Sequence, residues 1–294
     1  MKNKKNYLIS LLFTVYFTSA TASPLIVAHR AGTADYPENT VHAISMAIKN
    51  QADVIWLSIQ LTRDGIPVLY RPSDLKSLTN SEGLISEHSL LEIKMLDAAH
   101  FFKTEGQYFY RGRGMKIPSL QDVFTRFPKN HFILDIKSPD ADPVIMANIL
   151  STLITSNNLL DKVTLYSTDR KYLDALPDSI NKFENRHVTR KILTNAVMAN
   201  DCKISAKRDK TQYHAFELRR EVKVVEKFTL GKGASRAQLV WNQQAMDCFK
   251  KNSNSKILLI GINSAEDYQL AKDLGADYVM TDSPPPPKIG VKFT

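Results

Sequence analysis

Short apolar runs alternate with amphipathic segments along most of the chain. Apolar runs typical of buried strands occupy residues 25–30, 54–62, 67–71, 131–137, 163–168, 256–263 and 277–282. Helical patterns occupy residues 40–50, 119–127, 143–156, 169–176 and 264–275. Continuously apolar strands that are followed in turn by helices predict a parallel sheet covered by helices. Repetition of this unit over 294 residues favours an α/β fold of the closed (β/α)8, or TIM-barrel, type.

Two stretches interrupt this alternation. Residues 72–116 form a long polar and aromatic segment with one helical piece at 89–99, and residues 180–240 show no clear pattern. The alternative architecture, a doubly wound sheet, usually carries a G-x-G-x-x-G phosphate loop after an early strand. The first strand is followed here by HRAGTADYPENT, which lacks that spacing. We therefore expect a barrel.

The first 22 residues have the pattern of a secretory signal peptide. Three lysines within the first five residues precede an apolar run at residues 7–20, and a small-x-small cleavage motif ends at Ala22. Cleavage there would leave a domain of residues 23–294 and export it to the periplasm or out of the cell. The alternative is an uncleaved anchor, although the apolar run is shorter than the ~20 residues that a span needs.

The chain is basic. Removal of the signal peptide takes away three lysines and no acids, so the formal charge falls from +9 to +6. Such a charge suits an anionic membrane surface or a polyphosphate, although a solvated basic surface is the commoner explanation. We find no nucleic-acid-binding motif and expect no nucleic-acid partner.

The chain has two cysteines, Cys202 and Cys248. In an oxidising compartment they could form a disulfide, which would stabilise the fold by about 4 kcal/mol in the chain-entropy model. Two buried thiols are the alternative. Their spacing fits no zinc site.

Polar residues recur where the apolar strands end. In a TIM barrel the active residues lie at the carboxyl ends of the strands, so these polar groups are predicted to share one face. They are His29, Arg30, Ser58, Arg71, Asp135, Lys137, Ser167, Asn263, Thr281 and Asp282.

Several sequence blocks, in order, give the chain a family resemblance. They are HR at 29–30 with PENT at 37–40, ADVIWLSIQLTRDGIPVLY at 52–70, SLTNSEGLISEHSLLEIKMLDA at 77–98, KIPSLQDVFTRFP at 116–128, FILDIK at 132–137 and LGADYVMTDSP at 274–284. With these blocks the chain resembles the glycerophosphodiester phosphodiesterase (GDPD) family over nearly all of the predicted mature protein.

The resemblance implies a TIM barrel of the phospholipase-C-like phosphodiesterase type, with a small insertion after the second barrel strand, at about residues 72–116. Members of the family bind one divalent cation, usually Ca²⁺ or Mg²⁺. They cleave glycerophosphodiesters to an alcohol and glycerol 3-phosphate, using two histidines.

Part of the family's site is kept in this sequence. His29 and Arg30 match the first catalytic histidine and the phosphate-binding arginine. Glu38 and Asn39 match the central pair of the PENT motif, and the resemblance implies that they take part in binding the substrate. Asp135 stands where the family usually has a metal-binding Glu, so Asp135 and Glu38 are the remaining candidates for metal ligands.

The other part is replaced. Trp56 and Ser58 stand at the two acids of the family's Glu-x-Asp metal motif, and Arg71 stands at the second histidine. A hard cation wants about six to eight oxygens, several of them charged. We therefore expect the usual metal site to be lost and no cofactor to be bound. Arginine is well suited to phosphate, so Arg71 with Arg30 and Lys137 predicts an anion site.

Three functional hypotheses follow. The first is an exported family member that binds or acts on a glycerophosphodiester or a phospholipid head group, catalytically impaired or a pseudoenzyme. The second is an active, metal-independent phosphoric diester hydrolase or lyase that uses His29 with Arg30 and Arg71. The third is a structural or interaction barrel that presents the charged stretch 207–227. No second histidine is predicted at a strand end, although His88 and His100 in the insertion could reach the barrel mouth.

Overall fold

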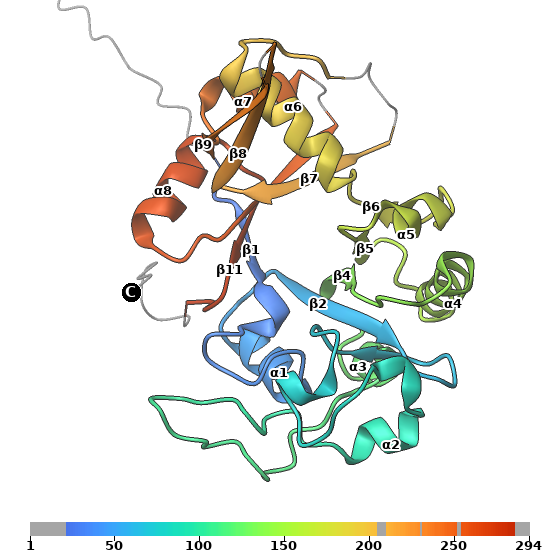
Figure 1. Cartoon of the computed structure of the whole chain (residues 1–294). Helices are drawn as coiled ribbons and strands as arrows, with labels where there is room; N and C mark the ends of the chain where they lie inside the picture. Colours follow the sequence, from blue (N-terminus) through green and yellow to red (C-terminus); the bar gives the residue numbers. More distant parts are fainter. Residues whose placement is uncertain (1–21, 205–209, 230, 252–253, 286–294) are drawn as a thin grey trace, which may run out of the picture.

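The computed structural model describes residues 22–204, 210–229, 231–251 and 254–285, and in them eight parallel strands form a nearly closed barrel (Figure 1). The strands are β1 (Leu25–Ala28), β2 (Val54–Leu61), β4 (His131–Ile136), β5 (Val163–Tyr166), β6 (Asn181–Lys182), β7 (Gln212–Glu217), β10 (Ser255–Ile260) and β11 (Tyr278–Thr281). They are hydrogen-bonded in the order β6-β5-β4-β2-β1-β11-β10-β7. A parallel bridge between Phe183 and Tyr213 brings the two ends of this order together. The predicted TIM barrel is confirmed.

Helices cover the outside of the barrel, as Figure 1 shows. They are α1 (Val41–Lys49), α3 (Leu120–Arg126), α4 (Pro143–Ser156), α5 (Arg170–Ala175), α6 (Arg186–Met198), α7 (Gln243–Lys250) and α8 (Ala265–Asp273). Most begin at a residue whose side chain accepts a backbone N–H of the first turn, for example Ser119 at α3 and Asp142 at α4. Their apolar faces pack on the barrel and form two large buried clusters with the outward side chains of the strands.

Aromatic and aliphatic side chains fill the barrel interior. Val27, Val54, Ile133, Leu258 and Met280 form one buried cluster with several rings. Because side chains alternate along a strand, every second residue of each strand points inward. The inward residues near the carboxyl ends of the strands therefore form the floor of the barrel mouth.

The segment between the second barrel strand and α3 is an elaborate insertion. It contains β3 (Pro67–Leu69), which pairs antiparallel with β2, two 3-10 turns, η2 (Leu75–Ser77) and η3 (Ile85–Glu87), and α2 (Leu90–Met95). Its own small core includes Leu75, Ile85, Ile93 and Ile117. The predicted helix at 89–99 is shorter than expected. Its last part turns because the Asp97 side chain accepts the N–H groups of Ala99 and Gly112, at 3.0 and 2.8 Å.

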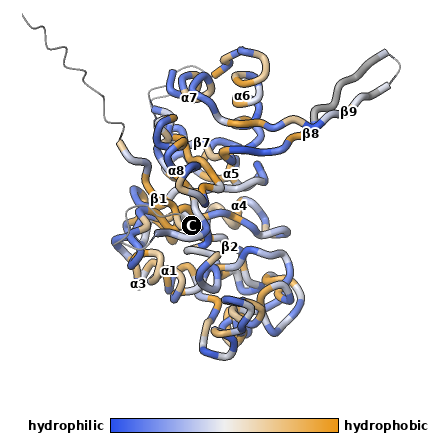
Figure 2. The backbone as a smooth tube through the Cα atoms, turned by 90° about the vertical axis from the view of Figure 1, so that its left-hand side faces the viewer, coloured by the Kyte–Doolittle hydropathy of each residue, from blue (hydrophilic) through white to orange (hydrophobic). Residues whose placement is uncertain are grey.

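A β-hairpin follows the sixth barrel strand, where the sequence had shown no clear pattern. Strands β8 (Arg219–Phe228) and β9 (Gly231–Val240) pair antiparallel over ten residue pairs. Figure 2 shows the two strands leaving the body of the molecule together. Among their described side chains, Val222 and Leu239 are buried, and both lie near the base. Much of the charged stretch 207–227 therefore belongs to β7 and to this arm.

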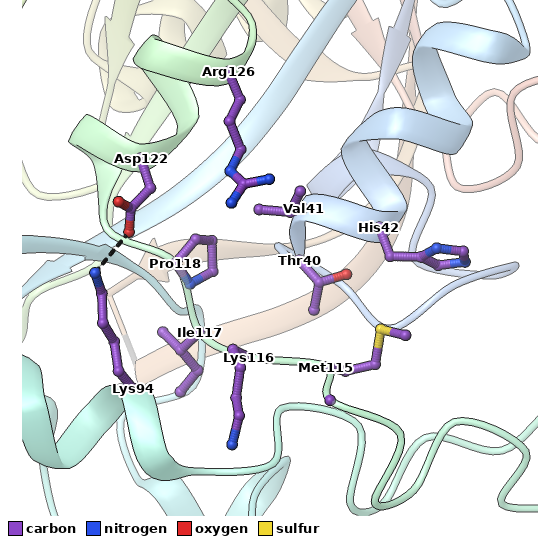
Figure 3. A pocket seen from close by; sticks show the side chains of 11 residues that line it. Thr40, Val41, His42, Lys94, Met115, Lys116, Ile117, Pro118, Asp122 and Arg126 are labelled. Carbon is purple, nitrogen blue, oxygen red and sulfur yellow. Dashed lines mark ion pairs between the residues drawn. The ribbon is translucent and has the colours of Figure 1, made fainter.

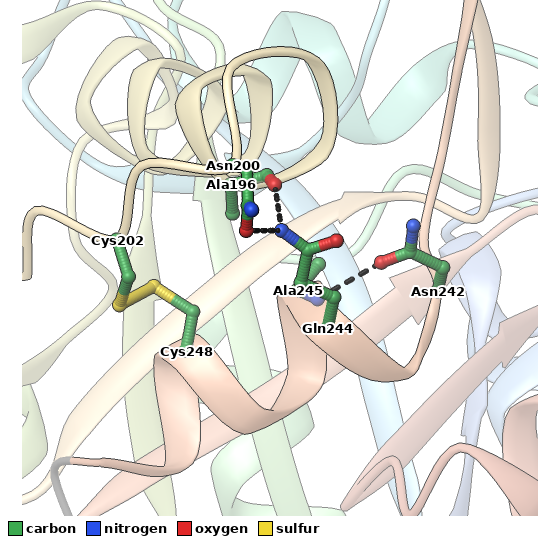
Figure 4. The surroundings of a disulfide bond; sticks show 7 residues. All are labelled: Ala196, Asn200, Cys202, Asn242, Gln244, Ala245 and Cys248. Atoms are coloured by element: carbon green, nitrogen blue, oxygen red, sulfur yellow. Dashed lines mark hydrogen bonds between the residues drawn. A yellow bond between two sulfur atoms is a disulfide. The ribbon is translucent and has the colours of Figure 1, made fainter.

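The structure joins Cys202 to Cys248 by a disulfide, with 5.6 Å between their Cα atoms (Figure 4). Cys248 lies in α7, and Cys202 lies in the chain that leaves α6. The Gln244 amide of α7 also donates to the Ala196 carbonyl and the Asn200 side chain, at 2.8 and 2.6 Å. The end of α6 is thus attached to α7 at several points.

The predicted signal peptide lies almost entirely outside the described residues, which begin at residue 22. Among the helices that the structure does describe, none has the length and apolar character needed to cross a membrane.

Candidate active site

The carboxyl ends of the barrel strands surround a hollow of about 290 Å³. Its lining comes from most of the barrel strands and from the segments that follow them. The lining residues are His29, Trp56, Ser58, Arg71, Asp135, Lys137, Tyr166, Thr168, Arg186, Glu217, Arg220, Ile260 and Met280. We call this feature the mouth hollow. It brings together five of the residues expected at strand ends.

His29 is held by a carboxylate. Its Nδ1 lies 2.5 Å from Asp282 Oδ1, just beyond β11, and so Nδ1–H donates to Asp282. Asn263 fixes Asp282 in turn, because its amide donates to Asp282 Oδ2 at 3.0 Å. The hydrogen bond from His29 lowers the pKa of Asp282, which therefore stays ionised. The His29 ring thus keeps Nε2 as its acceptor atom, as a general base requires.

Arg30 follows His29 in a turn with unusual backbone geometry. Both Arg30 (φ 48°) and Ala31 (φ 67°) are left-handed, a conformation that is costly for residues other than glycine. The turn brings Arg30 Nε to 3.3 Å from His29 Nε2, while the guanidinium forms an ion pair with Glu38. Thr33 also donates to Glu38, at 3.0 Å. Glu38 therefore positions the arginine. Arg30 and Glu38 both lie outside the lining of the mouth hollow, with Arg30 next to His29 at its edge.

Asn39 supports the wall of the barrel. Its Oδ1 accepts the backbone N–H of Ser58 at 3.0 Å, and the residue is 2% exposed. Its own backbone is left-handed (φ 58°), which asparagine tolerates better than most residues. The structure thus gives the predicted substrate-binding residues Glu38 and Asn39 supporting positions behind Arg30 and β2.

Trp56 and Ser58 belong to the interior of the barrel. Trp56 is 3% exposed, and its ring centroid lies 4.8 Å from that of Tyr166. Ser58 is fully buried beside Asp135, its register partner on β4. This part of the mouth hollow is therefore lined by an aromatic ring and a small hydroxyl, neither of which carries a charge.

Asp135 is the buried carboxyl of the mouth hollow. It is 4% exposed, and its Oδ2 lies 3.1 Å from Lys137 Nζ. Burial raises its pKa to about 6, against the opposing effects of Lys137, Trp56 and His29. Oδ1 of Asp135 has no hydrogen-bond partner among the described residues. A carboxyl with such a pKa can hold a proton near neutral pH and give it up.

Arg71 differs from the other cations of the mouth hollow. Arg186 and Arg220 both pair with Glu217, and Lys137 pairs with Asp135. Arg71 is exposed and forms no ion pair or hydrogen bond with any described residue. Its guanidinium is therefore available to an anion that enters the hollow.

The sequence interpretation missed Arg186, Glu217 and Arg220. Arg186 is the first residue of α6, Glu217 ends β7, and Arg220 lies at the root of the hairpin. All three fall in the region 180–240, whose elements were not assigned. The alternating pattern QYHAFE followed by LRR was the signal that could have placed a strand end here.

The carboxylates Asp135, Glu217 and Glu38 are engaged by basic side chains and leave few free oxygens for a hard cation. In the described part of the chain, no group of three or more His, Cys, Asp or Glu side chains is arranged to hold a metal ion. The unpaired Arg71 would also repel a cation at this place.

None of the other described histidines lines the mouth hollow. His88 Nε2 lies 3.2 Å from the Glu82 carbonyl, and His100 packs edge-on against Phe101. Neither lines the mouth hollow. His214 is buried beside Thr189, 3.3 Å from its hydroxyl. His29 is therefore the histidine of the mouth hollow.

A second hollow, of about 520 Å³, lies outside the barrel between α1, α3 and the insertion (Figure 3). Lys94 there pairs with Asp122 at 3.0 Å, and Lys116 donates to the Met95 carbonyl. Arg126 is exposed and has no ion pair among the described residues. A substitution at Arg126 can therefore serve as a control for the same substitution at Arg71.

The fold and the mouth hollow define a phosphodiesterase-like TIM barrel, and comparison with known proteins identifies the family. The model of the glycerophosphoryl diester phosphodiesterase family matches residues 29–284, so the chain belongs to that family. It is 36% identical over 270 residues to the uncharacterized protein Rv2277c of Mycobacterium tuberculosis, covering 90% of this chain and 88% of that protein. It is 35% identical over 136 residues to a glycerophosphodiester phosphodiesterase of Bacillus subtilis, covering 44% and 45% of the two chains.

Solved structures of known proteins have the same fold as this chain. The crystal structure of the glycerophosphoryl diester phosphodiesterase domain of Rv2277c superposes with a TM-score of 0.82 at 34% identity, over 90% of this chain and 97% of that one. An Oleispira antarctica phosphodiesterase, solved with its product sn-glycerol-3-phosphate, shares the fold with a TM-score of 0.58 at 19% identity. The match covers 89% of this chain and 94% of the Oleispira antarctica chain.

Proposed function

We propose that this chain cleaves a glycerophosphodiester without the divalent cation usual in its family. The observation that carries the proposal is that His29, bound to Asp282 at 2.5 Å, lines the same hollow as Arg71, which has no ion pair among the described residues. The pair supplies an oriented base, and the arginine supplies positive charge for a phosphate. A glycerophosphodiester is the substrate class because the family acts on such diesters.

The chemistry needs one group that accepts a proton and one that gives a proton. A hydroxyl of the substrate, or a water molecule, attacks phosphorus while His29 Nε2 takes its proton. The P–O bond to the alcohol breaks, and the leaving oxygen takes a proton from Asp135. Arg71 and Arg30 stabilise the negative charge that develops on the phosphoryl oxygens, which is the task of the cation in other members.

The test is hydrolysis of several glycerophosphodiesters with Ca²⁺, with Mg²⁺ and with EDTA. We expect turnover that persists in EDTA and is lost in His29→Ala. Arg71→Gln should weaken binding of glycerol 3-phosphate by about tenfold or more, because hydrogen bonds to charged groups contribute about 1.5–3 kcal/mol. Arg126→Gln is the matched control, since it also removes an exposed arginine without an ion pair. Turnover that EDTA abolishes would refute the proposal.

A second candidate is a pseudoenzyme that binds a phosphodiester without cleaving it. The replacement of the second histidine by Arg71 and of the metal-binding acids by Trp56 and Ser58 favours this candidate. The same experiment separates the two. Glycerol 3-phosphate that binds through Arg71, with no turnover of any tested diester under any metal condition, identifies the pseudoenzyme.

We also propose that the protein is exported, with cleavage after Ala22, and that an anionic membrane surface is one of its partners. The disulfide between Cys202 and Cys248 supports export, because disulfides persist in oxidising compartments and are rare in the cytosol. The excess of basic residues supports an anionic partner.

A further inference from the structure

Three aromatic side chains stand exposed on one segment of the insertion. We call residues 101–113 the aromatic loop. Phe101, Tyr108 and Phe109 are 47%, 38% and 53% exposed. Figure 1 shows this segment as a long loop with little regular structure that runs outside α1. Exposed rings gathered in this way commonly mark a binding surface.

Basic side chains of the same loop cover the rings. The Arg111 guanidinium lies 3.5 Å from the centroid of the Tyr108 ring, and Lys103 Nζ lies 4.9 Å from the same ring. The Arg113 guanidinium lies 4.1 Å from the Phe109 centroid. None of these three cations forms an ion pair with a carboxylate of the described residues. The surface is therefore both aromatic and positively charged.

We propose that the aromatic loop docks the protein on an anionic phospholipid surface. At a bilayer interface, rings enter the head-group region while lysine and arginine side chains extend to the phosphates. A protein partner fits this surface less well, because the cores of protein interfaces are depleted of charge and a buried unpaired cation is costly. The aromatic loop also has a net positive charge, since it contains one acidic residue, Glu105, and three basic residues. This is the sign that an anionic surface attracts.

The loop is attached to the mouth side of the barrel. Tyr110 packs against Tyr36 and His42, with centroids 6.4 and 5.4 Å apart. Tyr36 belongs to the connection between β1 and α1, which also carries Glu38. In a barrel this connection lies on the face that holds the mouth hollow. A membrane bound by the aromatic loop would therefore lie beside the opening. The proposal rests on the anionic membrane partner proposed above. It concerns binding and holds whether or not the mouth hollow turns over a substrate.

The test is flotation of the purified mature chain with phosphatidylcholine vesicles, with and without phosphatidylglycerol. We expect binding to the anionic vesicles that weakens as salt is raised. Phe109→Ser should weaken vesicle binding by about tenfold, because the variant has no phenyl ring to bury among the lipid head groups. Arg113→Gln should weaken it by about fivefold, since each cation near an anionic surface contributes about 1 kcal/mol.

Val144→Ser is the matched control, because Val144 is 60% exposed on α4, away from the loop. It should bind as the unaltered chain does. Equal binding to neutral and anionic vesicles would overturn the proposal, and so would Phe109→Ser binding as strongly as the control. A dimer in solution that Phe109→Ser dissociates would also overturn it, because the loop would then be an interface between two copies.

Discussion

At the scale of single residues, the mouth hollow combines a histidine held by a carboxylate with an arginine that has no ion pair among the described residues. His29 is bound to Asp282, while Trp56 and Ser58 are buried in the interior of the barrel. With four basic side chains in its lining, the hollow suits an anion.

The proton position on His29 depends on the charge of Asp282. In Asp282→Asn, the side-chain amide can donate to Nδ1, which favours the tautomer whose Nε2 carries the proton and cannot act as a base. We expect kcat/KM for a glycerophosphodiester to fall by about a hundredfold or more, with binding of glycerol 3-phosphate little changed. Asp35→Asn is the control, since Asp35 accepts from Ser283 and does not contact His29. An unchanged kcat would contradict the assigned role.

Asp135 should make the stability of the fold depend on pH. Its pKa is raised from 3.8 to about 6, so the folded state binds its proton more tightly than the unfolded state does. The contribution of Asp135 to the free energy of unfolding should therefore decrease as pH rises from about 4 through 6. Asp135→Asn removes the buried charge and keeps the shape. Above pH 6 the variant should be more stable, by up to about 3 kcal/mol.

Urea unfolding at several pH values measures this difference, which should shrink to near zero at about pH 4. Asp161→Asn is the control, because Asp161 is an exposed carboxylate with no described ion pair. A difference that stays constant over this pH range would show that Asp135 is ionised throughout. The variant should also lose turnover, since it cannot supply a proton.

At the scale of elements, the sequence predicted the regular parts of the barrel and missed the irregular ones. Strands such as β2 and β4 can be predicted from their own residues alone, because burial on both faces makes them apolar throughout. The hairpin of β8 and β9 could not be found in this way. Most of its described side chains are exposed, so no apolar face marks it. Strand β6 is two residues long and too short to give a pattern.

The clarity of the local pattern also decided which residues of the mouth hollow could be predicted from the sequence. Residues at the ends of well-patterned strands, such as Asp135 and Lys137, were found. Arg186 and Glu217 were missed because their elements were unassigned, although they pair with each other in the mouth hollow. Asp282 was recognised as a strand end, but its bond to His29 joins residues 253 positions apart, and no local pattern reports that contact.

The disulfide is predicted to stabilise the elements it joins without affecting the mouth hollow. Its cysteines are 46 positions apart, so in the chain-entropy model the cross-link contributes about 4 kcal/mol. Replacing both cysteines with alanine should lower the free energy of unfolding by about that amount and leave kcat unchanged, since neither lines the hollow. Denaturation in urea measures the first effect. An equal midpoint for both proteins would contradict it.

At the scale of the whole molecule, the predicted cleavage site and the start of the fold coincide. The barrel begins at Leu25, whose N–H donates to the Asp277 carbonyl at 2.9 Å, and Ile26 N–H donates to Asp53. Cleavage after Ala22 would leave two residues before this first strand. Removal of the predicted signal peptide would therefore take away no residue of the barrel, and export would place the cysteines where their disulfide persists.

We expect the exported protein to begin at Ser23 and to contain no free thiol. N-terminal sequencing and intact mass after alkylation of the protein from a cell fraction check both points. Ala22→Arg should block processing, because the cleavage motif requires a small residue there, and the precursor should accumulate with the lysine-rich segment attached. Val144→Ser, far from the motif, should be processed normally. Recovery of the unaltered chain in membranes with Met1 still present would instead identify residues 7–20 as an anchor, and the protein would then reach lipid head groups while attached to the bilayer.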